Sequence, residues 1–591
     1  MATNNTKLEL TWIDKYEERP GIEPRIFIED SSHSCGEIET GMLNNGKPWN
    51  GNMLIHGDNL LALKALEQHY SGSIKCIYID PPYNTGNAFE QYDDNVEHSI
   101  WLSLMRDRLV LLRNLLAPDG VIFVQINDDE AAYLKVLLDE VFGRRNYETT
   151  FYIKVRHEDR ILREDSRYQL VMEQVFCYRK TDLYEPPRRP KTKNSSDDYE
   201  YKLEVHGTPV ETIHIGIYDV EVYRPEAYSI IRTEKGEGDL KYYQIRGSLI
   251  TQAGSASEYY EKYLRERRSS DGLGTMYKVL GMGINGDGLG YRTIFQPTKE
   301  DSKNGFYLQG KPLKQKENKG LPYPNYYDYV QVFNNAGYEG GVDFKGGKKP
   351  EAYLQFILSL AGIKPGDVVL DSFLGSGSTA AVCSKLKIRW IGVEIGDHAY
   401  THCYPRLKRI VDGTDDTGIS SSINWKGGGG FKFYELAPSL LKKDSHGHLV
   451  INKEYNADML AAAMAKMEGF TYEPSTETFW KQGHSSETDY IYTTTQFLTV
   501  ESLGAILDTM ADGESLLICC KAFQPECKNF SSRITVKKIP SVLLGRCEFD
   551  HDDYSLNIIE LPQTEEIEDS EDMDNYPEAS SDNLSSEPSL F

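Results

Sequence analysis

At the point that decides the fold, the sequence reads Ile77-Tyr78-Ile79-Asp80-Pro81-Pro82-Tyr83-Asn84-Thr85-Gly86. A β-branched apolar run that stops at Pro-Pro predicts a buried parallel strand followed by a rigid turn, because proline fixes φ and cannot donate to a strand ladder. The turn holds a carboxylate, a backbone carbonyl and a flat aromatic ring within four residues. These groups can accept two hydrogen bonds from one amino group while a ring stacks on Tyr83.

Such a turn suits the methylation of an amine of low basicity. The amino nitrogen of adenine has a lone pair delocalised into the ring, and acceptors on its two hydrogens favour a tetrahedral nitrogen that can attack a methyl group. The candidate catalytic residues are Asp80, Pro81, Pro82 and Tyr83. Asp80 would hold and polarise the nitrogen. The alternative is an ordinary β-turn, since Asp and Pro are common turn residues, and a cofactor site elsewhere must decide.

Composition predicts a soluble, multidomain protein of the cytosol. The 591 residues, of which 39% are apolar, leave room for about three or four domains. No stretch approaches the roughly 18 apolar residues of a membrane span, and the N-terminus lacks a basic region followed by an apolar one. The nine cysteines form no Cys-x-x-Cys pair, which predicts reduced, packed thiols and no metal site.

The net charge of −25 argues at first against a nucleic-acid partner, which requires a basic surface. The charge is uneven, because residues 564–591 hold ten acids and no Lys or Arg, whereas residues 151–340 hold 29 basic and 28 acidic residues. The tail 564–591 is also Ser-rich and poor in apolar residues, so we expect it to be disordered. Any basic face therefore belongs to the middle of the chain.

Strands and helices alternate on both sides of the Asp-Pro-Pro-Tyr turn. Residues 52–60 read as a strand that ends in Gly-Asp before a helix, so Asp58 either caps that helix or binds a ligand. An amphipathic helix over 101–116 leads through a turn into a strand at 121–126, and another helix follows over 130–142. This alternation predicts a parallel sheet.

From residue 155 to residue 345 the alternation breaks down. This segment holds 21 of the 39 tyrosines and two runs in which Arg and Lys mix with proline or tyrosine, 187–193 and 259–268. Aromatic residues interleaved with basic ones suit stacking on bases and pairing with phosphates. The alternative for each run is a Tyr-rich insertion with a solvated, charged helix.

A second decisive stretch is Asp371-Ser372-Phe373-Leu374-Gly375-Ser376-Gly377-Ser378, where a Gly-rich loop joins a strand to a helix. The next strand, 389–394, ends in Glu394. This layout is typical of sites for an adenosine cofactor, because glycines let the backbone approach the ligand and the terminal carboxylate binds the ribose hydroxyls. The loop lacks the third glycine of the dinucleotide pattern and any Gly-Lys-Ser/Thr, which disfavours NAD and ATP. Turn glycines without a ligand are the alternative.

Together these motifs resemble those of amino-methylating DNA methyltransferases of the β class. Asp80-Pro81-Pro82-Tyr83 is similar to the catalytic motif of adenine-N6 enzymes, and Asp371 to Gly377 is similar to their S-adenosylmethionine loop. The catalytic motif precedes the loop by about 290 residues, which is the circularly permuted order of that class. Further matches resemble the modification subunit of type III restriction–modification systems. They are His56 to Leu60, Asp80 to Gly86, Trp101 to Arg108, Asp119 to Glu130, Phe142-Gly143 and Lys349-Pro350.

The resemblance implies an α/β fold with a Rossmann-like, S-adenosylmethionine-dependent methyltransferase core and a mostly parallel sheet. It implies that Asp80 and the carbonyl of Pro81 bind the amino group of a flipped-out adenine that stacks on Tyr83. Glu394 would bind the cofactor's ribose, and Asp58 would lie near its adenine end. The cofactor-binding residues that it implies are Asp58, Asp371, Phe373, Gly375, Gly377, Ser378 and Glu394.

The pattern and the resemblance together predict six segments. They are an N-terminal arm (1–50), the catalytic half of the core (51–154), a target-recognition insertion (155–345), the cofactor-binding half (346–426), a small C-terminal α/β domain for dimer or partner contacts (427–563) and the acidic tail (564–591). The chain shows neither an ATP loop nor a nuclease carboxylate cluster. The resemblance therefore implies a separate helicase–nuclease subunit, together with double-stranded DNA and a second copy of the chain, as partners in a prokaryotic cytoplasm.

Two other functions remain open at this point. One is a stand-alone or other defence methyltransferase with the same core, whose partner, if any, is encoded elsewhere. The other is a sequence-specific DNA-binding protein with a vestigial cofactor site. The intact turn, loop and Glu394 argue against the second of these.

Overall fold

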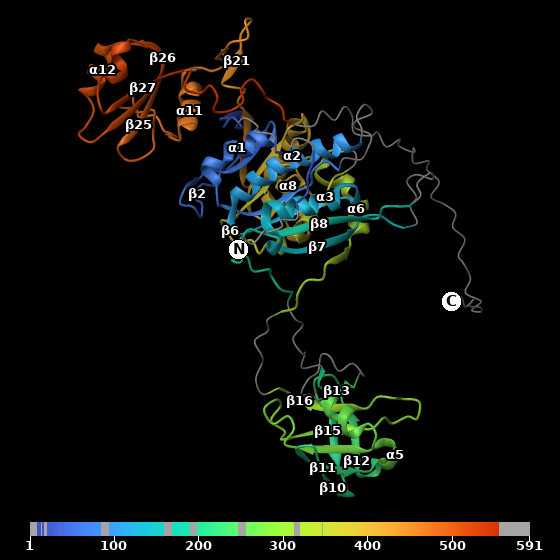
Figure 1. The fold of residues 1–591 in the computed structure, drawn as a ribbon. Coiled ribbons are helices and arrows are strands. Elements are labelled where there is room, and N and C mark those ends of the chain that lie inside the picture. The colour runs from blue at the N-terminus through green and yellow to red at the C-terminus, as the bar shows by residue number, and fades with distance from the viewer. Residues whose placement is uncertain are drawn as a thin grey trace, which may run out of the picture. The chain divides into compact units, whose positions relative to one another are not determined.

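A computed structural model forms two compact units, Met1–Pro187 with Pro324–Phe591, and Arg188–Tyr323 (Figure 1). The structure describes residues 9–12, 15–16, 21–83, 94–158, 168–189, 198–245, 256–312, 320–344, 347–539 and 541–554. Within these ranges, none of the helices combines the length and the apolar character that a membrane crossing requires. The predicted tail, 564–591, lies outside the described residues.

The first unit is built on one ten-stranded sheet. In spatial order its strands are β1 (Phe27–Gly36), β20 (Gly430–Leu436), β4 (Asn52–His56), β19 (Arg389–Glu394), β18 (Val368–Asp371), β5 (Ile74–Ile79), β6 (Leu116–Ile126), β8 (Met172–Arg179), β7 (Tyr147–Lys154) and β17 (Tyr326–Asp328). Neighbours from β20 through β6 run parallel, whereas β1 with β20 and β8 with β6 and β7 form antiparallel pairs. The predicted α/β core with a mostly parallel sheet is confirmed.

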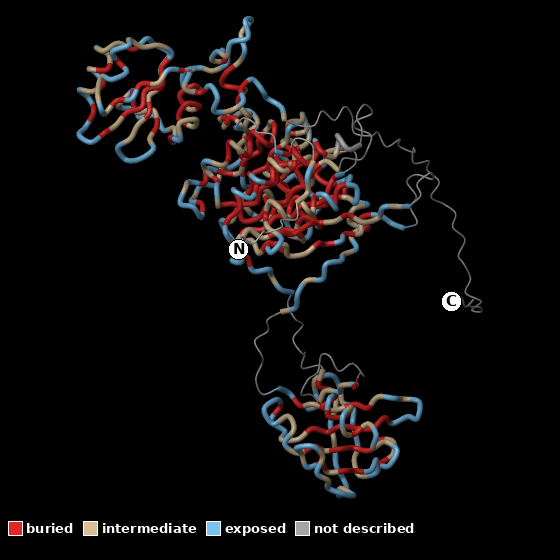
Figure 2. Tube along the Cα trace, viewed as in Figure 1, coloured by how far each residue is buried: buried red, intermediate tan, exposed pale blue. Residues whose placement is uncertain are grey.

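Helices connect the parallel strands and pack on the sheet (Figure 1). They are α1 (Asn59–Tyr70), α2 (Asp94–Leu115), α3 (Asp128–Leu138), α6 (Val330–Asn334), α7 (Glu351–Leu360), α8 (Ser378–Lys385), α9 (Tyr404–Val411) and α10 (Ser420–Ile423). All six residues of β5 are buried, because a parallel strand inside such a sheet is covered on both faces. Figure 2 shows the buried residues gathered in the middle of this unit.

Two local predictions need adjustment around β6 and α3. The turn expected before residue 121 is part of β6, where the pairing with β5 shifts register between Leu116 and Val121. The helix α3 stops at Leu138 and continues as a π-helical turn to Gly143. Gly143 has φ of 89°, a left-handed conformation that suits the predicted glycine stop.

The N-terminal arm and the C-terminal domain also have different boundaries from those predicted. β1 of the arm pairs with β20, so both strands complete the central sheet, and a short hairpin, β2 (Gly41–Met42) with β3 (Pro48–Trp49), follows β1. After Leu436 come the hairpin β21 (Leu441–Lys443) with β22 (Leu449–Ile451), and a five-stranded sheet with helices α11 (Ala457–Glu468) and α12 (Val500–Leu507). The strands of that sheet are β23 (Thr471–Tyr472), β24 (Gly483–His484), β25 (Asp489–Leu498), β26 (Ser515–Phe523) and β27 (Ile534–Lys538). The nine cysteines are free thiols, and seven of them are buried.

The second unit, Arg188–Tyr323, contains an eight-stranded antiparallel sheet. In spatial order its strands are β10 (Glu211–Ile215), β11 (Tyr218–Tyr223), β14 (Met276–Leu280), β15 (Tyr291–Phe295), β16 (Phe306–Gly310), β13 (Leu240–Gln244), β9 (Tyr201–Val205) and β12 (Tyr228–Arg232), and its helices are α4 (Ala256–Tyr259) and α5 (Arg268–Asp271). This unit is shorter than the predicted insertion of 155–345, because β8 and β17 pair within the central sheet.

The two runs singled out in this unit have different outcomes. In the run 259–268, Tyr259 and Tyr260 are buried in the core of the unit, and Arg265 pairs with Glu261, so the structure favours a packed helix over a base-stacking surface. The greater part of the other run, 190–193, lies outside the described residues.

Candidate active site

Four neighbouring strands carry an acid at or just after their carboxyl ends. The strands β4, β19, β18 and β5 lie side by side in parallel, and they lead to Asp58, Glu394, Asp371 and Asp80. The carboxyl ends of parallel strands meet at one edge of a sheet, where ligands of α/β folds bind. The four acids therefore lie at one edge of the sheet.

Asp80 and Tyr83 belong to a cluster of four polar side chains, with Lys349 before α7 and Glu173 on β8. The Tyr83 hydroxyl donates to Asp80 Oδ1 at 2.7 Å and to Glu173 Oε2 at 2.9 Å. Lys349 Nζ lies 2.9 Å from the Tyr83 oxygen, 3.1 Å from Asp80 Oδ2 and 3.1 Å from Glu173 Oε2. The same ammonium group lies 5.2 Å from the centre of the Tyr83 ring. The turn is therefore tied to a buried cation and a second carboxylate.

The two carboxylates of this cluster differ in basicity. Burial raises the pKa of Asp80, and Lys349 offsets only part of that increase. Burial also acts to raise the pKa of Glu173, but Lys349 and the hydrogen bond from Gln125 outweigh it, so its pKa is lowered. Burial would lower the pKa of Lys349, yet the two carboxylates together raise it. The Lys349 ammonium thus lies between one acid with a raised pKa and one with a lowered pKa.

Within the described residues, the carbonyls of Pro81 and Pro82 differ in their hydrogen bonds. Trp101 Nε1 donates to the carbonyl of Pro82 at 2.9 Å, which fixes the end of the turn against α2. Among the described residues, none donates a hydrogen bond to the carbonyl of Pro81. The role expected of this carbonyl, to accept from an amino group, stays a prediction. The last residues of the motif, 84–86, lie outside the described part of the chain.

The glycine loop has the backbone geometry that its sequence predicts. Gly375 and Gly377 have φ of 55° and 79°, which side-chain-bearing residues rarely adopt. A Cβ atom on Gly377 would lie 3.3 Å from Cys403 Cα. Asp371 accepts from Phe373 N at 3.0 Å and from Thr379 Oγ1 at 2.6 Å, which fixes both ends of the loop. Burial raises the pKa of Asp371 to about 7 despite these two bonds.

Glu394 lies across from this loop at the end of β19. Its Oε2 accepts from Gly375 N at 2.7 Å and its Oε1 from Gly396 N at 3.1 Å. Burial raises the pKa of Glu394 against the effect of these two N–H groups. A carboxylate has about four lone-pair sites, so two remain for the paired hydroxyls of a ribose. The loop and Glu394 thus fit an adenosine cofactor.

The sequence comparisons agree with this geometry. A family model described as DNA methylase matches residues 74–404, which is more than half of the chain. The chain belongs to the DNA methylase family. The match spans β5 with its Asp80 turn, the second unit, the glycine loop and Glu394.

Relatives of this methylase include several whose names place them in restriction–modification systems. It is 33% identical to the probable type III restriction-modification enzyme HindVI Mod subunit of Haemophilus influenzae, over 70% of this chain and 57% of that protein. It is 29% identical to the StyLTI Mod subunit of Salmonella typhimurium, over 56% and 49%, and 25% identical to the type II methyltransferase M.EcaI of Enterobacter cloacae, over 71% and 81%. The chain thus spans about half the length of the two Mod subunits.

Asp58 and Ser378, two further predicted cofactor residues of this methylase, also make hydrogen bonds within the protein. Asp58 Oδ1 caps α1 by accepting from Leu60 N at 2.7 Å, and its Oδ2 lies 3.3 Å from the guanidinium of Arg108. This geometry favours the capping role for Asp58. The hydroxyl of Ser378 accepts from Arg406 at 2.7 Å. The side chain of Phe373 is half-buried and packs against the main core.

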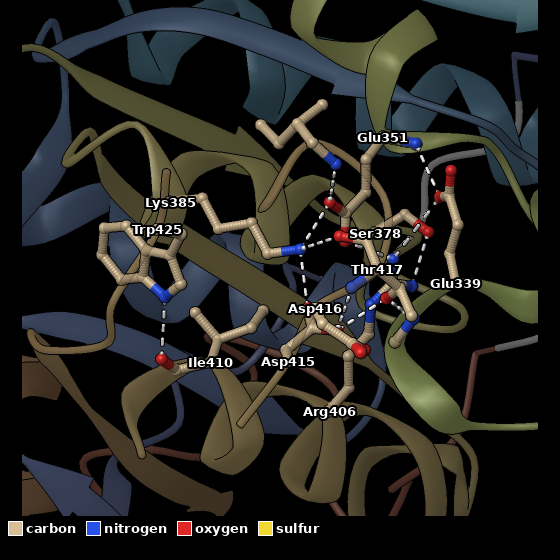
Figure 3. A network of polar contacts seen from close by, with 12 residues as sticks. Glu339, Glu351, Ser378, Lys385, Arg406, Ile410, Asp415, Asp416, Thr417 and Trp425 are labelled. Carbon is tan, nitrogen blue, oxygen red and sulfur yellow. Dashed lines mark hydrogen bonds and ion pairs between the residues drawn. The ribbon is translucent and has the colours of Figure 1, made fainter. Parts of the chain in front are cut away.

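A buried ion network lies next to Ser378, the first residue after the glycine loop (Figure 3). Glu351 heads α7 and pairs with Lys385 of α8 at 2.6 Å and with Arg406 of α9 at 2.9 Å, and all three side chains are 0% exposed. Lys385 also pairs with Asp415 at 2.6 Å. Arg406 donates to the carbonyl of Ser376 at 3.2 Å, so the network reaches the loop itself.

Glu173, Gln125 and the role of Lys349 were missed in the sequence. Glu173 lies in β8, 90 residues after Tyr83, and no motif in the surrounding sequence indicates a functional site. Lys349 was noted only as part of a Lys-Pro match. In β8 the polar residues Glu173 and Gln174 precede the apolar run Val175-Phe176-Cys177, an ordinary strand start that carries no signal for a site.

Removing the charge of Glu351 tests the network. We expect Glu351→Gln to lower stability by about 3–5 kcal/mol, because it leaves Lys385 and Arg406 without a shared buried partner. The matched control is Glu454→Gln, whose pair with Lys442 is exposed and is expected to contribute at most about 1 kcal/mol. Scanning calorimetry should show the midpoint of the first unit falling by several degrees only for Glu351→Gln. Equal midpoints for the two variants would contradict the role of the network.

Proposed function

We propose that this chain transfers a methyl group from S-adenosylmethionine to the N6 amino group of a flipped-out adenine in DNA. The observation that carries the proposal is the placement of the Asp80 turn and the glycine loop at the ends of the adjacent strands β5 and β18. Membership in the DNA methylase family supports it. The adenine assignment follows the Asp-Pro-Pro-Tyr form of the turn.

The residues of the turn would bind and orient the base. Asp80 and the carbonyl of Pro81 accept the two amino hydrogens, while Tyr83 stacks on the ring. Lys349 lies beside the Tyr83 hydroxyl, 2.9 Å from its oxygen and 5.2 Å from the ring centre, and fixes the direction of the ring. Extrusion from the duplex costs a few kcal/mol of unstacking, which these contacts offset.

On the cofactor side, S-adenosylmethionine supplies an electrophilic methyl group on a sulfonium. Asp371, Phe373, Gly375 and Gly377 would line its methionine part, and Glu394 would accept from the ribose hydroxyls. Ser378 would act through its bond to Arg406, and Asp58 through the cap that it places on α1. Asp80 then polarises the amino nitrogen and receives its proton.

The biological setting is a further part of the proposal. The Mod-subunit relatives support a modification and recognition subunit of a type III-like restriction–modification system. Its partners would be double-stranded DNA, a second copy of the chain and a separate helicase–nuclease subunit, in the cytoplasm of a prokaryotic cell. M.EcaI, of which this chain covers 81%, favours a second candidate, a methyltransferase that acts alone. Co-purification with the neighbouring gene products would separate the two.

The product and the role of Asp80 can be tested together. Mass spectrometry of digested DNA should show N6-methyladenine, and N4-methylcytosine in its place would contradict the base assignment. We expect Asp80→Ala to slow turnover about a hundredfold or more while leaving cofactor affinity nearly unchanged, because it removes an acceptor from the reacting nitrogen. Asp119→Ala is the control, since Asp119 pairs with Lys75 at the amino end of the sheet. Near-normal turnover of Asp80→Ala would reject the catalytic assignment.

The cofactor site has its own test. We expect Gly377→Leu to abolish S-adenosylmethionine binding, because the left-handed backbone and Cys403 leave no room for a side chain. Glu394→Ala should weaken binding about ten- to hundredfold through loss of a hydrogen bond to a charged acceptor. Gly504→Leu is the control, because a Cβ atom there meets nothing within 4 Å. Calorimetry that found full affinity in both site variants would place the cofactor elsewhere.

The second unit is proposed to read the target sequence. It forms its own compact body with its own core, and the segment around it balances basic against acidic residues in an otherwise acidic chain. Exchange of 188–323 for the corresponding unit of a related enzyme should transfer the methylated sequence, as read by genome-wide methylation mapping. An active hybrid that kept the old site would assign recognition to the first unit.

A further inference from the structure

Glu173 is a second acid in the candidate active site that the turn motif does not contain. It comes from β8, where it pairs with Ile153 of β7, and its side chain is only 11% exposed. Its Oε2 lies within hydrogen-bonding distance of Tyr83, Lys349 and Gln125. A buried carboxylate requires a paired cation or hydrogen-bond donors, and Glu173 has three such partners on one oxygen.

The cluster has fewer hydroxyl protons than acceptors for them. The ammonium of Lys349 has three protons and three acceptors, namely Asp80, Glu173 and the Tyr83 oxygen. The Tyr83 hydroxyl has one proton, yet two carboxylate oxygens lie within 2.9 Å of it. It can donate fully to only one of them at a time.

Gln125 fixes Glu173 as an acceptor. The Gln125 Oε1 accepts from the hydroxyls of Tyr78 at 2.6 Å and Tyr353 at 2.8 Å, so its Nε2 must point at Glu173. An oxygen that faces three donors has no place for a proton of its own. Glu173 therefore remains ionised, in agreement with its lowered pKa.

Asp80 is the more basic of the two carboxylates. Burial is the main cause of its raised pKa, Lys349 opposes it and the charge of Glu173 adds to it. The other titratable groups that face Asp80 are Tyr83, Tyr78 of β5, Tyr353 of α7 and Asp371 of β18. Two acids whose environments separate their basicities in this way take different roles in a site.

We propose that Glu173 is a positioning residue that accepts the hydrogen bond of the Tyr83 hydroxyl when the target amino group binds Asp80, so that Asp80 is free to accept and Tyr83 stays fixed under the base. This inference rests on the proposed function. Lys349 holds the two carboxylates apart throughout. Its direct partners are the two acids and the Tyr83 oxygen.

The transfer step balances with these residues alone. The N6 lone pair forms the new N–CH3 bond while the S–CH3 bond breaks, and the bonding pair stays on sulfur. The methylated nitrogen loses one proton to the Asp80 carboxylate, which later passes it to water. Glu173 does not change its protonation state. Its charge and its bond to Tyr83 keep Asp80 available for this proton.

The test is the single-turnover rate of the full chain as a function of pH. The substrate is duplex DNA with the target sequence in unmethylated form, and S-adenosylmethionine is saturating. Glu173→Gln should lower the rate about ten- to hundredfold, the effect of one hydrogen bond to a charged group, without changing cofactor affinity. In a Tyr83→Phe background the same change should cost little more, because the hydroxyl that donates to Glu173 is already absent. Glu148→Gln, an acid paired with Arg179 at the far end of β7, should behave as the wild type.

The pH–rate profile separates a positioning role from a merely structural one, because only the positioning role shifts its acid limb. Asp80 must be ionised to accept, so activity falls as the pH drops through its pKa. Glu173→Gln removes a negative neighbour and should move this acid limb to lower pH. Lys349→Met removes a positive neighbour and should move it to higher pH, whereas Lys349→Arg should restore it.

The outcomes are distinguishable from failure of the proposed function. If the wild type neither binds S-adenosylmethionine nor methylates DNA, the proposed function fails. If the wild type is active but Glu173→Gln keeps its rate and its acid limb, the positioning role is overturned. It is also overturned if Glu173→Gln loses cofactor affinity or thermal stability in step with rate, or if its cost is additive with that of Tyr83→Phe.

Discussion

The first unit depends on a single buried carboxylate, that of Glu351. It takes one oxygen to Lys385 and the other to Arg406, which brings the start of α7 together with α8 and α9. Because the Glu351 side chain is fully buried, loss of its pairing with the two cations would lower the free energy of unfolding by several kcal/mol. Gly418 leaves room for it, since a Cβ atom there would lie 2.2 Å from Glu351 Oε2. The helices that support the glycine loop are therefore fixed by charge as well as by apolar packing.

The segment before Glu351 extends this constraint to the catalytic turn. Lys349 stands two residues upstream, and Pro350 between them takes the N-cap position of α7. A proline before a helix has a fixed φ and donates no hydrogen bond, so the direction of the two flanking side chains is set by the backbone. One side chain enters the network next to the glycine loop and the other enters the cluster around Asp80. The two halves of the candidate site thus share one short, stiff segment.

The sequence predicts the parts of this arrangement that local pattern determines. The strand ending at Asp80, the loop at Gly375 and Gly377 and the acid at Glu394 follow from turn chemistry and from the alternation of strands with helices. The pairing of β1 with β20 joins residues 27–36 to 430–436, and no local pattern encodes so distant a contact. The limits of the second unit were placed too wide for the same reason. Glu173 was missed because its function comes from a partner 90 residues away.

The carboxyl edge of the sheet is strongly acidic, and this has a consequence for the proposed substrates. Asp80, Asp371 and Glu394 all have raised pKa values, chiefly through burial, and Asp80 and Glu394 each add to the increase at Asp371. A cation such as a sulfonium relieves this repulsion and favours the ionised forms that the proposed reaction needs. A phosphate backbone meets the opposite condition, because the same acids repel it. Under the proposed function, this edge would favour the cationic cofactor and the neutral base over the phosphates, and the contacts to phosphate would come from other surfaces of the chain.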